Sequence, residues 1–386
     1  MANNNNKDKC NVPNLRFPEF SGEWEMSSIG EQFELYSGNT PSRMNKNQFD
    51  GSINWITSGE LKEHYISDTK EKISEEAAKN NSLKLLPVGT FVIAIYGLEA
   101  NGVRGTCSIT TRESTISQAC MAFTSKMDIQ NEFLYSWYKK HGNIIGIKYA
   151  QGTKQQNLSY DIIERFNISY PCMEEQKKLI RFISLIDQRI ATQNKIIEDL
   201  KKLKSAISER LFNAIKGDVV VLEDIGDVVK GKQINGEFLS ESGKYYVMNG
   251  GIEPSGFYND YNVEANTISI SEGGNSCGYV QFNACPFWSG GHCYTIQNTT
   301  DNVKTEYLYQ FLKSKESEIM KLRIGSGLPN IQKKDLAKFK ITIPNISEQK
   351  VISAFLSSFE RKADVKMNFV NLLLEEKQYL LRQMFI

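Results

Sequence analysis

The sequence lacks an excess of either charge. Its 386 residues carry 46 Lys and Arg and 45 Asp and Glu, for a formal net charge of +1. A protein that binds nucleic acid alone usually shows a basic excess, because contacts to phosphates supply most of the affinity. If this chain binds DNA, its positive charge is therefore segregated on one face, or partner subunits supply the rest.

A cysteine framework is also missing. The cysteines are odd in number and contain no Cys-x-x-Cys pair, which argues against a set of disulfides or a standard zinc site. Cys277, Cys285, His292 and Cys293 lie close in sequence, but their spacings are irregular, so we predict small buried side chains there and no metal. We expect reduced thiols at Cys10, Cys107, Cys120, Cys172, Cys277, Cys285 and Cys293.

Long apolar runs are absent as well. No stretch approaches the roughly 18 apolar residues that a membrane helix needs, and the opening MANNNNKDKC has no hydrophobic signal region. We therefore expect a cytoplasmic protein that makes no contact with a membrane, with a disordered polar tail over residues 1–14.

Recognisable catalytic motifs do not occur. With only His64, His141 and His292 available, acid–base chemistry by histidine has few candidates. Residues 226–233, GDVVKGKQ, nearly spell a phosphate-binding loop, but Gln233 has no hydroxyl for magnesium and DVVK is β-prone. We interpret this stretch as a strand that runs into a turn, and we predict no catalytic residue in the chain.

What the sequence does contain is a duplication. The stretch QGTKQQNLSYDIIERFNISYP at 151–171 is answered by GSGLPNIQKKDLAKFKITIP at 325–344. A repeat of this size indicates two folded units rather than a solenoid. A constant shift of 173 residues pairs Gly105 with Gly278, Cys120 with Cys293, Asn157 with Asn330, Phe166 with Phe339, Pro171 with Pro344 and Gln176 with Gln349.

Each copy begins with a globular part of mixed structure. TFVIAIYG and NTISISEGG are rich in apolar and β-branched residues and end in glycine, as buried strands do, while NEFLYSWYKKH and TEYLYQFLKSKESEIMKLR are helical. We therefore predict an α+β fold with two α/β globular domains. The expected divisions are a tail at 1–14, a first globular domain at 15–173, a first spacer helix at 174–216, a second globular domain at 217–345 and a second spacer helix at 346–386.

Each copy ends in a long helix whose apolar residues follow heptad spacing, with Gln193, Lys204, Lys366 and Lys377 filling the gaps. This seam predicts a left-handed coiled coil. The seam residues are Leu179, Ile183, Ile186, Ile190, Ile197, Leu200, Ile207 and Leu211 in the first helix and Ile352, Leu356, Phe359, Ala363, Val370, Leu373, Leu380 and Met384 in the second.

Two arrangements of these helices are open. In one, they simply cover the globular domains, which would call for a wider apolar stripe than a seam. In the other, they pair antiparallel within the chain as a pseudo-twofold rod, roughly 50 Å long at about 1.5 Å per residue, with a globular domain at each tip.

Polar loops recur at one place in each globular domain, at 151–157 and 323–330. Lysine and arginine suit phosphates or guanine edges, and amides can pair with adenine. The paired Asn157 and Asn330 fit either a DNA contact or a turn cap, while Lys154 and Arg323 favour a DNA contact.

The opening VPNLRFPEFSGEWEMSSIGE, the paired turns QGTKQQNLS and GSGLPNIQ, and the paired P-x-x-x-E-Q-K helix starts resemble the specificity subunit of type I restriction-modification systems. The resemblance spans almost the whole chain from Val12. It implies that each globular part is a target recognition domain that reads one half of a split site in double-stranded DNA. It also implies that the antiparallel helices fix the gap and dock two methyltransferase subunits, with endonuclease/translocase subunits attached to them. Catalysis and its cofactors, S-adenosylmethionine, ATP and Mg, would then belong to the partner subunits and none to this chain.

The two domains carry different loops, so we expect an asymmetric target. The polar residue after the asparagine is not kept, since NLSYDII in the first copy corresponds to NIQKKDL in the second, and we assign no role to that position. A scaffold that binds only proteins, a nucleotide-dependent enzyme built on GDVVKGKQ, and a methylation-only complex are the alternative readings. By side-chain type and loop position, the candidate DNA-binding residues are Arg43, Lys46, Arg104, Lys148, Lys154, Gln155, Asn157, Lys232, Asn249, Asn275, Arg323, Asn330 and Lys333.

Overall fold

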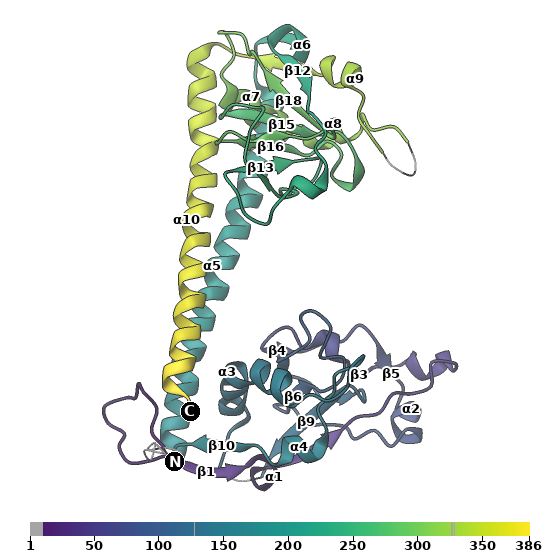
Figure 1. Cartoon of the computed structure of the whole chain (residues 1–386), viewed down its shortest axis with the longest axis vertical. Coiled ribbons are helices and arrows are strands. Elements are labelled where there is room, and N and C mark those ends of the chain that lie inside the picture. The colour runs from purple at the N-terminus through teal and green to yellow at the C-terminus, as the bar shows by residue number, and fades with distance from the viewer. Residues whose placement is uncertain (1–10, 127, 326, 328) are drawn as a thin grey trace, which may run out of the picture. The chain divides into compact units, whose positions relative to one another are not determined.

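The computed structural model describes residues 11–126, 128–325, 327 and 329–386. The chain divides into two compact units, one made of Met1–Thr192 with Val370–Ile386 and the other of Gln193–Phe369. Each unit contains one globular domain and a part of each long helix (Figure 1). Most of the predicted tail, residues 1–10, lies outside the described residues.

In the first globular domain, one sheet has the strand order β2-β9-β6-β7-β4, a second has the order β5-β3-β8, and β1 pairs with β10. Strand β6 lies inside the larger sheet and is buried along its whole length, as its apolar sequence predicts. The strands are β1 (Glu25–Ser28), β2 (Phe33–Ser37), β3 (Ile53–Ile56), β4 (Tyr65–Ile66), β5 (Lys72–Ile73), β6 (Phe91–Ala94), β7 (Cys107–Thr110), β8 (Ser114–Ile116), β9 (Cys120–Ser125) and β10 (Asn167–Tyr170). The helices are α1 (Ile29–Gln32), η1 (Lys46–Phe49), η2 (Ser58–Glu60), α2 (Glu75–Asn80), α3 (Asn131–Tyr149) and α4 (Tyr160–Glu164).

The second globular domain repeats this topology. Its sheets have the orders β12-β18-β15-β16 and β14-β13-β17, and β11 pairs with β19. The strands are β11 (Asp218–Val221), β12 (Asp227–Lys230), β13 (Tyr245–Met248), β14 (Phe257–Tyr258), β15 (Thr267–Ser271), β16 (Val280–Asn283), β17 (Trp288–Ser289), β18 (Cys293–Gln297) and β19 (Lys340–Ile343). The helices are α6 (Leu222–Ile225), η3 (Gly236–Phe238), η4 (Gly274–Ser276), α7 (Thr305–Ser314), α8 (Glu316–Met320) and α9 (Lys333–Ala337).

The two domains therefore share one strand order, apart from one edge strand. The smaller sheets share an unusual feature, because β3 pairs with β8 in parallel and β13 pairs with β17 in parallel. The larger sheet of the first domain has one more edge strand, β4, which the second domain lacks among its described residues. This difference agrees with the smaller size of the second domain, 217–345 against 15–173.

Paired residues of the duplication occupy the same places in both cores. Gly105 and Gly278 both have positive φ, and a Cβ would lie 2.8 Å from Asn143 N in the first case and 3.0 Å from Met320 Cα in the second. Cys120 and Cys293 are buried at the starts of β9 and β18, and burial raises the pKa of their thiols to about 12 and about 11. These thiols are therefore core side chains, which confirms the prediction for Cys293. Cys277 is buried as predicted, but the same prediction is wrong for Cys285, which is exposed.

The stretch GDVVKGKQ contains β12, which ends at Lys230 and passes into a turn. The structure thus agrees with a strand rather than a phosphate-binding loop. None of the helices in the described ranges is both long enough and apolar enough to cross a membrane.

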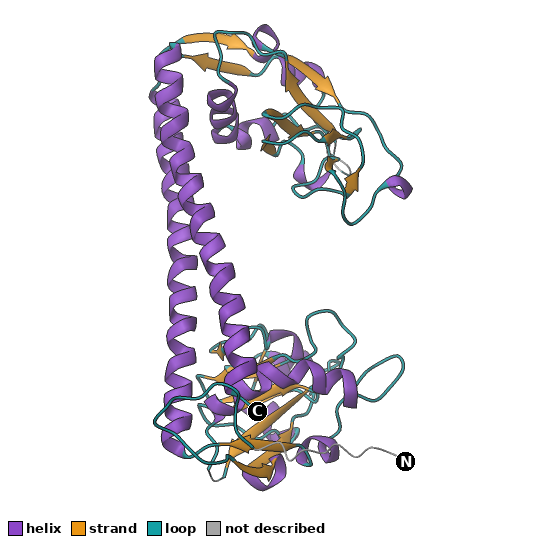
Figure 2. Cartoon of the chain, turned by 60° about the vertical axis from the view of Figure 1, so that its left-hand side comes forward, coloured by secondary structure: helices purple, strands orange, loops and turns teal. Residues whose placement is uncertain are grey.

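The long helices are α5 (Met173–Ala214) and α10 (Ile346–Met384), which lie side by side in Figures 1 and 2. None of the sixteen seam residues is exposed. In the first unit Lys377 Nζ lies 2.5 Å from Asp187 Oδ1, and in the second unit Lys204 Nζ lies 2.7 Å from Glu360 Oε1. Moving forward along α5 from Asp187 to Lys204 thus corresponds to moving back along α10 from Lys377 to Glu360, which is antiparallel pairing in one register.

A repeated glutamine fastens each helix to its own globular domain. Gln176 is fully buried, accepts a hydrogen bond from Gln130 N at 3.0 Å, and donates to Asp128 O and Pro171 O. Gln349 makes the equivalent three bonds with Lys304 N, Asn302 O and Pro344 O. The repeated P-x-x-x-E-Q-K sequence therefore encodes this junction, since it places the amide against backbone groups that would otherwise be buried without partners.

The C-terminal end of α10 packs on the first globular domain, and the C-terminal end of α5 packs on the second. Phe385, at the end of α10, is 2% exposed and its ring lies 5.2 Å from that of Phe133 in the first unit. Phe212, at the corresponding position of α5, lies 5.3 Å from Phe311 in the second unit. Each core is thus completed by residues remote in sequence.

We expect Phe385→Ala to destabilise the first unit by about 3 kcal/mol or more, because it leaves a cavity against α3. Hydrogen exchange should show faster exchange in β6, β9 and α3, with the second unit unchanged. Phe238→Ala, at an exposed phenylalanine, is the control. Equal loss of protection in both units would contradict this account of the core.

Stability should also fall in mild acid. Burial, with a contribution from Lys140, lowers the pKa of His141 to about 4, and its Nε2 lies 3.0 Å from Ile386 O. Because the unfolded chain binds the proton at higher pH than the folded one, this contribution is complete at pH 7 and is lost from about pH 6.5 towards pH 4. Urea midpoints measured across this range should shift less in His141→Gln than in the unmodified chain. Identical pH profiles would exclude His141 as the source.

Candidate nucleic-acid interface

The repeated polar loops have the same backbone closure in both domains. Gln151 and Asn157 exchange two backbone hydrogen bonds of 2.8 and 2.9 Å, and Ile324 and Asn330 exchange two of 2.8 and 3.0 Å. Each asparagine also bridges to the strand region beside it, Asn157 to Tyr96 and Asn330 to Gly273. The asparagines therefore close the bases of the two loops.

In the first loop, Lys154 and Gln155 are exposed. Arg104 is held below them, since its Nη2 donates to Gln156 Oε1 at 2.8 Å and its buried Nε has no hydrogen-bond partner among the described residues. Asn157 Oδ1 accepts a long bond of 3.4 Å from Gly97 N. Lys154 and Gln155 are thus free to reach a ligand, whereas Arg104 is partly committed to the loop.

The other first-domain candidates lie apart from this loop in the sequence and in their contacts. Arg43 forms a two-pronged ion pair with Glu71, which raises the arginine pKa and lowers that of the carboxyl, and its guanidinium lies 5.0 Å from the ring centre of Phe49. Lys148 lies in the last turn of α3, 5.2 Å from the Tyr149 ring. Lys46 begins η1, and its side chain lies outside the described part of the structure. The ion pair with Glu71 therefore gives Arg43 a structural role, independent of any contact with DNA.

The second-domain candidates also divide into free and occupied side chains. Lys232, Asn275, Arg323, Asn330 and Lys333 are exposed. Asn249 is half-buried, and its Oδ1 accepts a hydrogen bond of 3.1 Å from His292 N. Asn249 thus shapes the turn before β18.

Sequence reasoning missed one charged group, Glu272, at the end of β15. Its Oε1 lies 2.6 Å from Lys230 Nζ and 3.0 Å from Tyr294 Oη, while the buried Oε2 has no hydrogen-bond partner in the described residues. Ile331 N donates to Glu272 O as Leu158 N donates to Ile95 O in the first domain. An isoleucine and a glutamate therefore occupy equivalent places beneath the two loops. In the sequence, the only sign of this charged group was a single acidic residue at the end of the apolar run NTISISEGG.

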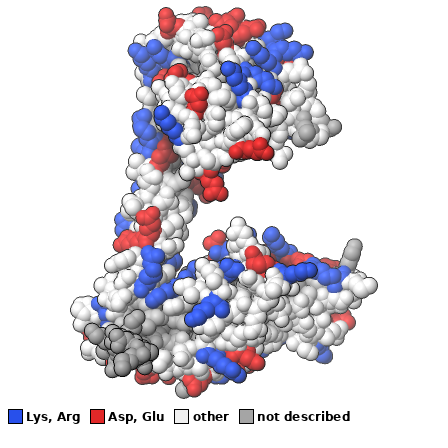
Figure 3. Space-filling view, in the orientation of Figure 1, with Lys and Arg blue, Asp and Glu red and all other residues white. Residues whose placement is uncertain are grey.

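Basic and acidic side chains are interspersed on the visible surface of both units (Figure 3). The described residues contain no group of three or more His, Cys, Asp and Glu that could hold a metal ion. The polar loops carry cationic and amide side chains, which suit contacts to a negatively charged polymer.

A family model described as the type I restriction modification DNA specificity domain matches residues 21–202 and 216–370. The chain belongs to this family. It is 26% identical over 364 residues to the type I restriction enzyme MjaIX specificity subunit of Methanocaldococcus jannaschii, and the match covers 83% of each chain.

Two solved structures share the fold. One is the S subunit of a type I restriction-modification system from M. genitalium, with a TM-score of 0.60, 19% identity, and coverage of 97% of this chain and 99% of that one. The other comes from a structure of type I restriction-modification complex assembly, with a TM-score of 0.61, 15% identity, and coverage of 94% and 97%. The predicted α+β fold with a doubled domain is thereby confirmed.

The chain is therefore the DNA sequence-recognition subunit of a type I restriction-modification system, a non-catalytic component with two target recognition domains. The family assignment confirms the predicted function. The roles of individual DNA-binding residues remain predictions.

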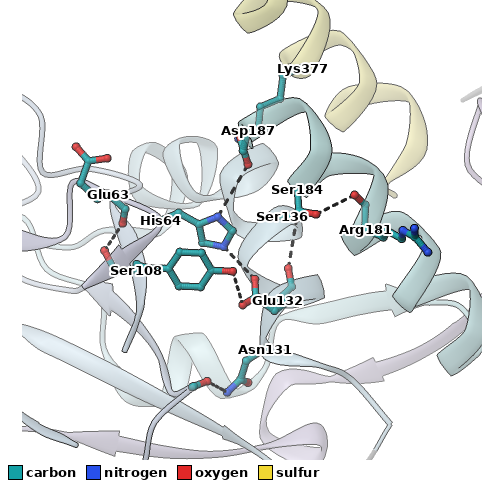
Figure 4. A network of polar contacts seen from close by, with 12 residues as sticks. Glu63, His64, Ser108, Asn131, Glu132, Ser136, Arg181, Ser184, Asp187 and Lys377 are labelled. Carbon is teal, nitrogen blue, oxygen red and sulfur yellow. Dashed lines mark hydrogen bonds and ion pairs between the residues drawn. The ribbon is translucent and has the colours of Figure 1, made fainter. Parts of the chain in front are cut away.

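In this specificity subunit, a polar network joins the first recognition domain to the helices (Figure 4). His64 stacks between the rings of Tyr65 and Tyr135, its Nε2 lies 2.9 Å from Glu132 Oε2, and its Nδ1 lies 3.9 Å from Asp187 Oδ2. Asp187 also pairs with Lys377. One acid of α5 therefore connects α10 with the recognition domain.

The second unit uses the equivalent acid of α10 in the same way. Glu360 Oε1 pairs with Lys204, and Glu360 Oε2 accepts a hydrogen bond of 3.0 Å from Gln310 Nε2 of α7. Tyr309 Oη lies 3.3 Å from Glu360 Oε1. Orientation of each recognition domain on its helices is thus tied to the helix register.

We expect Lys154→Ala and Arg323→Ala each to weaken DNA binding by the assembled complex nearly equally across sequences. Each should lower the slope of log affinity against log salt by about 1, because a cation contacting a phosphate releases about one counterion. Fluorescence anisotropy at several salt concentrations measures the slope. Lys202→Ala, at an exposed lysine of α5 that pairs with Glu198, is the control, and an unchanged slope in both loop variants would remove these residues from the interface.

Proposed function

We propose that each recognition domain reads one half of a bipartite, asymmetric DNA target. The proposal is carried by one observation: two domains of one topology present different side chains at equivalent places. On the repeated loops, the exposed Lys154 of the first domain corresponds to the exposed Gly327 of the second at the shift of 173 residues, and the first domain has the additional strand β4. Since base edges are read by individual side chains, different surfaces on one frame favour two different half-sites.

The proposed division is 15–173 and 217–345 for the recognition domains and 174–216 and 346–386 for the spacer helices. The spacer helices would set the gap between the half-sites and dock two methyltransferase subunits, and endonuclease/translocase subunits would attach through these. S-adenosylmethionine, ATP and Mg would be bound by those partners, and the complex would act on DNA in the cytoplasm.

Antiparallel pairing of α5 and α10 in one register supports a fixed gap. The lysine–carboxylate pairs of the two units obey the same register, and a polar pair in a heptad seam favours one alignment over others. The near-zero net charge is compatible with DNA binding if the partners share the phosphate contacts.

The test is to coexpress the chain with the methyltransferase encoded beside it and to map methylated adenines by single-molecule sequencing. We expect a split motif with a constant gap. Exchanging residues 15–173 for those of another family member should change one half-site only, and adding one heptad to both helices at matched positions should change the gap only.

A stable complex that leaves DNA unmethylated would instead favour a scaffold that binds proteins alone. A heptad insertion that changes a half-site would contradict the assignment of base reading to the domains and of spacing to the helices. Circular dichroism of each variant controls for loss of helix.

A further inference from the structure

The first turns of α5 are covered by a segment near the N-terminus, drawn in purple in Figure 1. Arg16 donates two hydrogen bonds, of 2.8 and 2.7 Å, to the carboxylate of Glu175, whose side chain is 1% exposed. The ring of Phe17 meets that of Phe182 edge to face at 5.8 Å. Lys178 lies 4.5 Å from the centre of the Phe17 ring. An arginine and the adjacent aromatic residue thus occupy one face of the helix.

The equivalent face of α10 is uncovered. A shift of 173 residues carries Glu175 to Glu348, Lys178 to Val351 and Phe182 to Phe355. Val351 is 69% exposed and Phe355 is 47% exposed, and Glu348 is also exposed. These three residues, which we call the open helix face, lie at helical spacing on one side of α10.

No segment in the described ranges covers this face as residues 15–20 cover α5. The first recognition domain is preceded by the covering segment, whereas the second follows α5 after only the short connection 215–217, because α5 ends at Ala214 and β11 begins at Asp218. Among the described residues, the one aromatic ring paired with that of Phe355 is that of Phe359, at 5.4 Å. Glu348 forms no ion pair with the described residues, and its Oε2 accepts a hydrogen bond of 2.9 Å from Asn345 Nδ2.

We propose that the open helix face binds a segment of the methyltransferase subunit that presents an arginine next to an aromatic residue. This inference rests on the proposed function, because it takes the methyltransferase as a partner. The carboxylate of Glu348 would accept the guanidinium, as Glu175 accepts Arg16, and the partner's aromatic ring would pack on Phe355, as Phe17 packs on Phe182.

The chemistry of the face selects this occupant over others. A carboxylate beside two apolar side chains repels phosphates, so DNA is a poor ligand there. A second copy of this chain is also disfavoured, because its own Arg16 and Phe17 are already bound to α5. Since the matching face of α5 is covered, only one of the two methyltransferase subunits would use this contact, and the two subunits would differ in affinity.

The experiment uses the full chain and the purified methyltransferase, with stoichiometry from native mass spectrometry and affinities from titration. We expect Phe355→Ser and Glu348→Lys each to weaken one of the two binding events by roughly tenfold or more and to leave the other unchanged. Phe355→Tyr, which keeps the ring, should bind as the unmodified chain does. Phe238→Ser, at a 65% exposed phenylalanine of the same unit, is the matched control.

A synthetic peptide of residues 11–20, NVPNLRFPEF, serves as a direct probe. It should protect the amides of α10 near Val351 from hydrogen exchange and compete with one methyltransferase subunit, and the same peptide with Arg16→Glu should do neither. If the Phe355 and Glu348 variants bind both subunits with unchanged affinity, the inference is overturned and the proposed function stands. If the unmodified chain binds no methyltransferase, the partner assignment in the proposed function is overturned along with it. Self-association of the chain that Phe355→Ser abolishes would assign the face to a second copy instead.

Discussion

Two lysine–carboxylate pairs fix how α5 and α10 align, and the positions of the recognition domains on the helices depend on that alignment. Lys377 and Lys204 fill gaps in the apolar seam, and their partners Asp187 and Glu360 lie beside it. All four side chains are half-buried. A register slip by one heptad would leave each charge in the seam without its partner, which costs far more than a slip in a purely apolar seam. Because both acids also contact the recognition domains, one interaction specifies helix register and domain attachment together.

The recognition domains are held rigidly at their bases and vary at their loops. Gln176 and Gln349 fill the same role in the two copies, with three backbone partners each. A buried amide with all its partners in place rigidifies its surroundings, whereas removing it would leave several backbone groups unsatisfied. On and beside the repeated loops, by contrast, Lys154, Gln155 and Arg323 are exposed. A domain whose base is fixed by buried hydrogen bonds can therefore carry different exposed side chains without losing its fold. This suits a domain that recognises a DNA sequence through its exposed side chains.

Much of this architecture could be predicted because the duplication presents each sequence pattern twice. The paired glycines, cysteines and glutamines stood 173 residues apart in the sequence, and each pair proved to share one structural place. Heptad spacing predicted the seam because its period differs from that of a helix covering a sheet. Topology was out of reach, since nothing local indicates that β3 and β8 run parallel. The partners of individual side chains could not be predicted from the sequence either. Arg43 is a candidate DNA contact by its residue type, and the structure pairs it with Glu71. Glu272 follows a strand in the sequence, and the structure buries it against Lys230.

A duplicated chain cannot be fully symmetric, because a single polypeptide has only one N-terminal segment. The first copy uses that segment to bury Glu175 and cover Phe182, while the second copy follows α5 directly and no described residue takes the place of that segment. A phenylalanine and a valine left exposed on adjacent turns of α10 forgo the free energy that burial would supply. The equivalent face of α5 is covered. The physical asymmetry thus begins at the level of chain connectivity, before any difference in the recognition loops, and it gives two otherwise equivalent helices different surfaces.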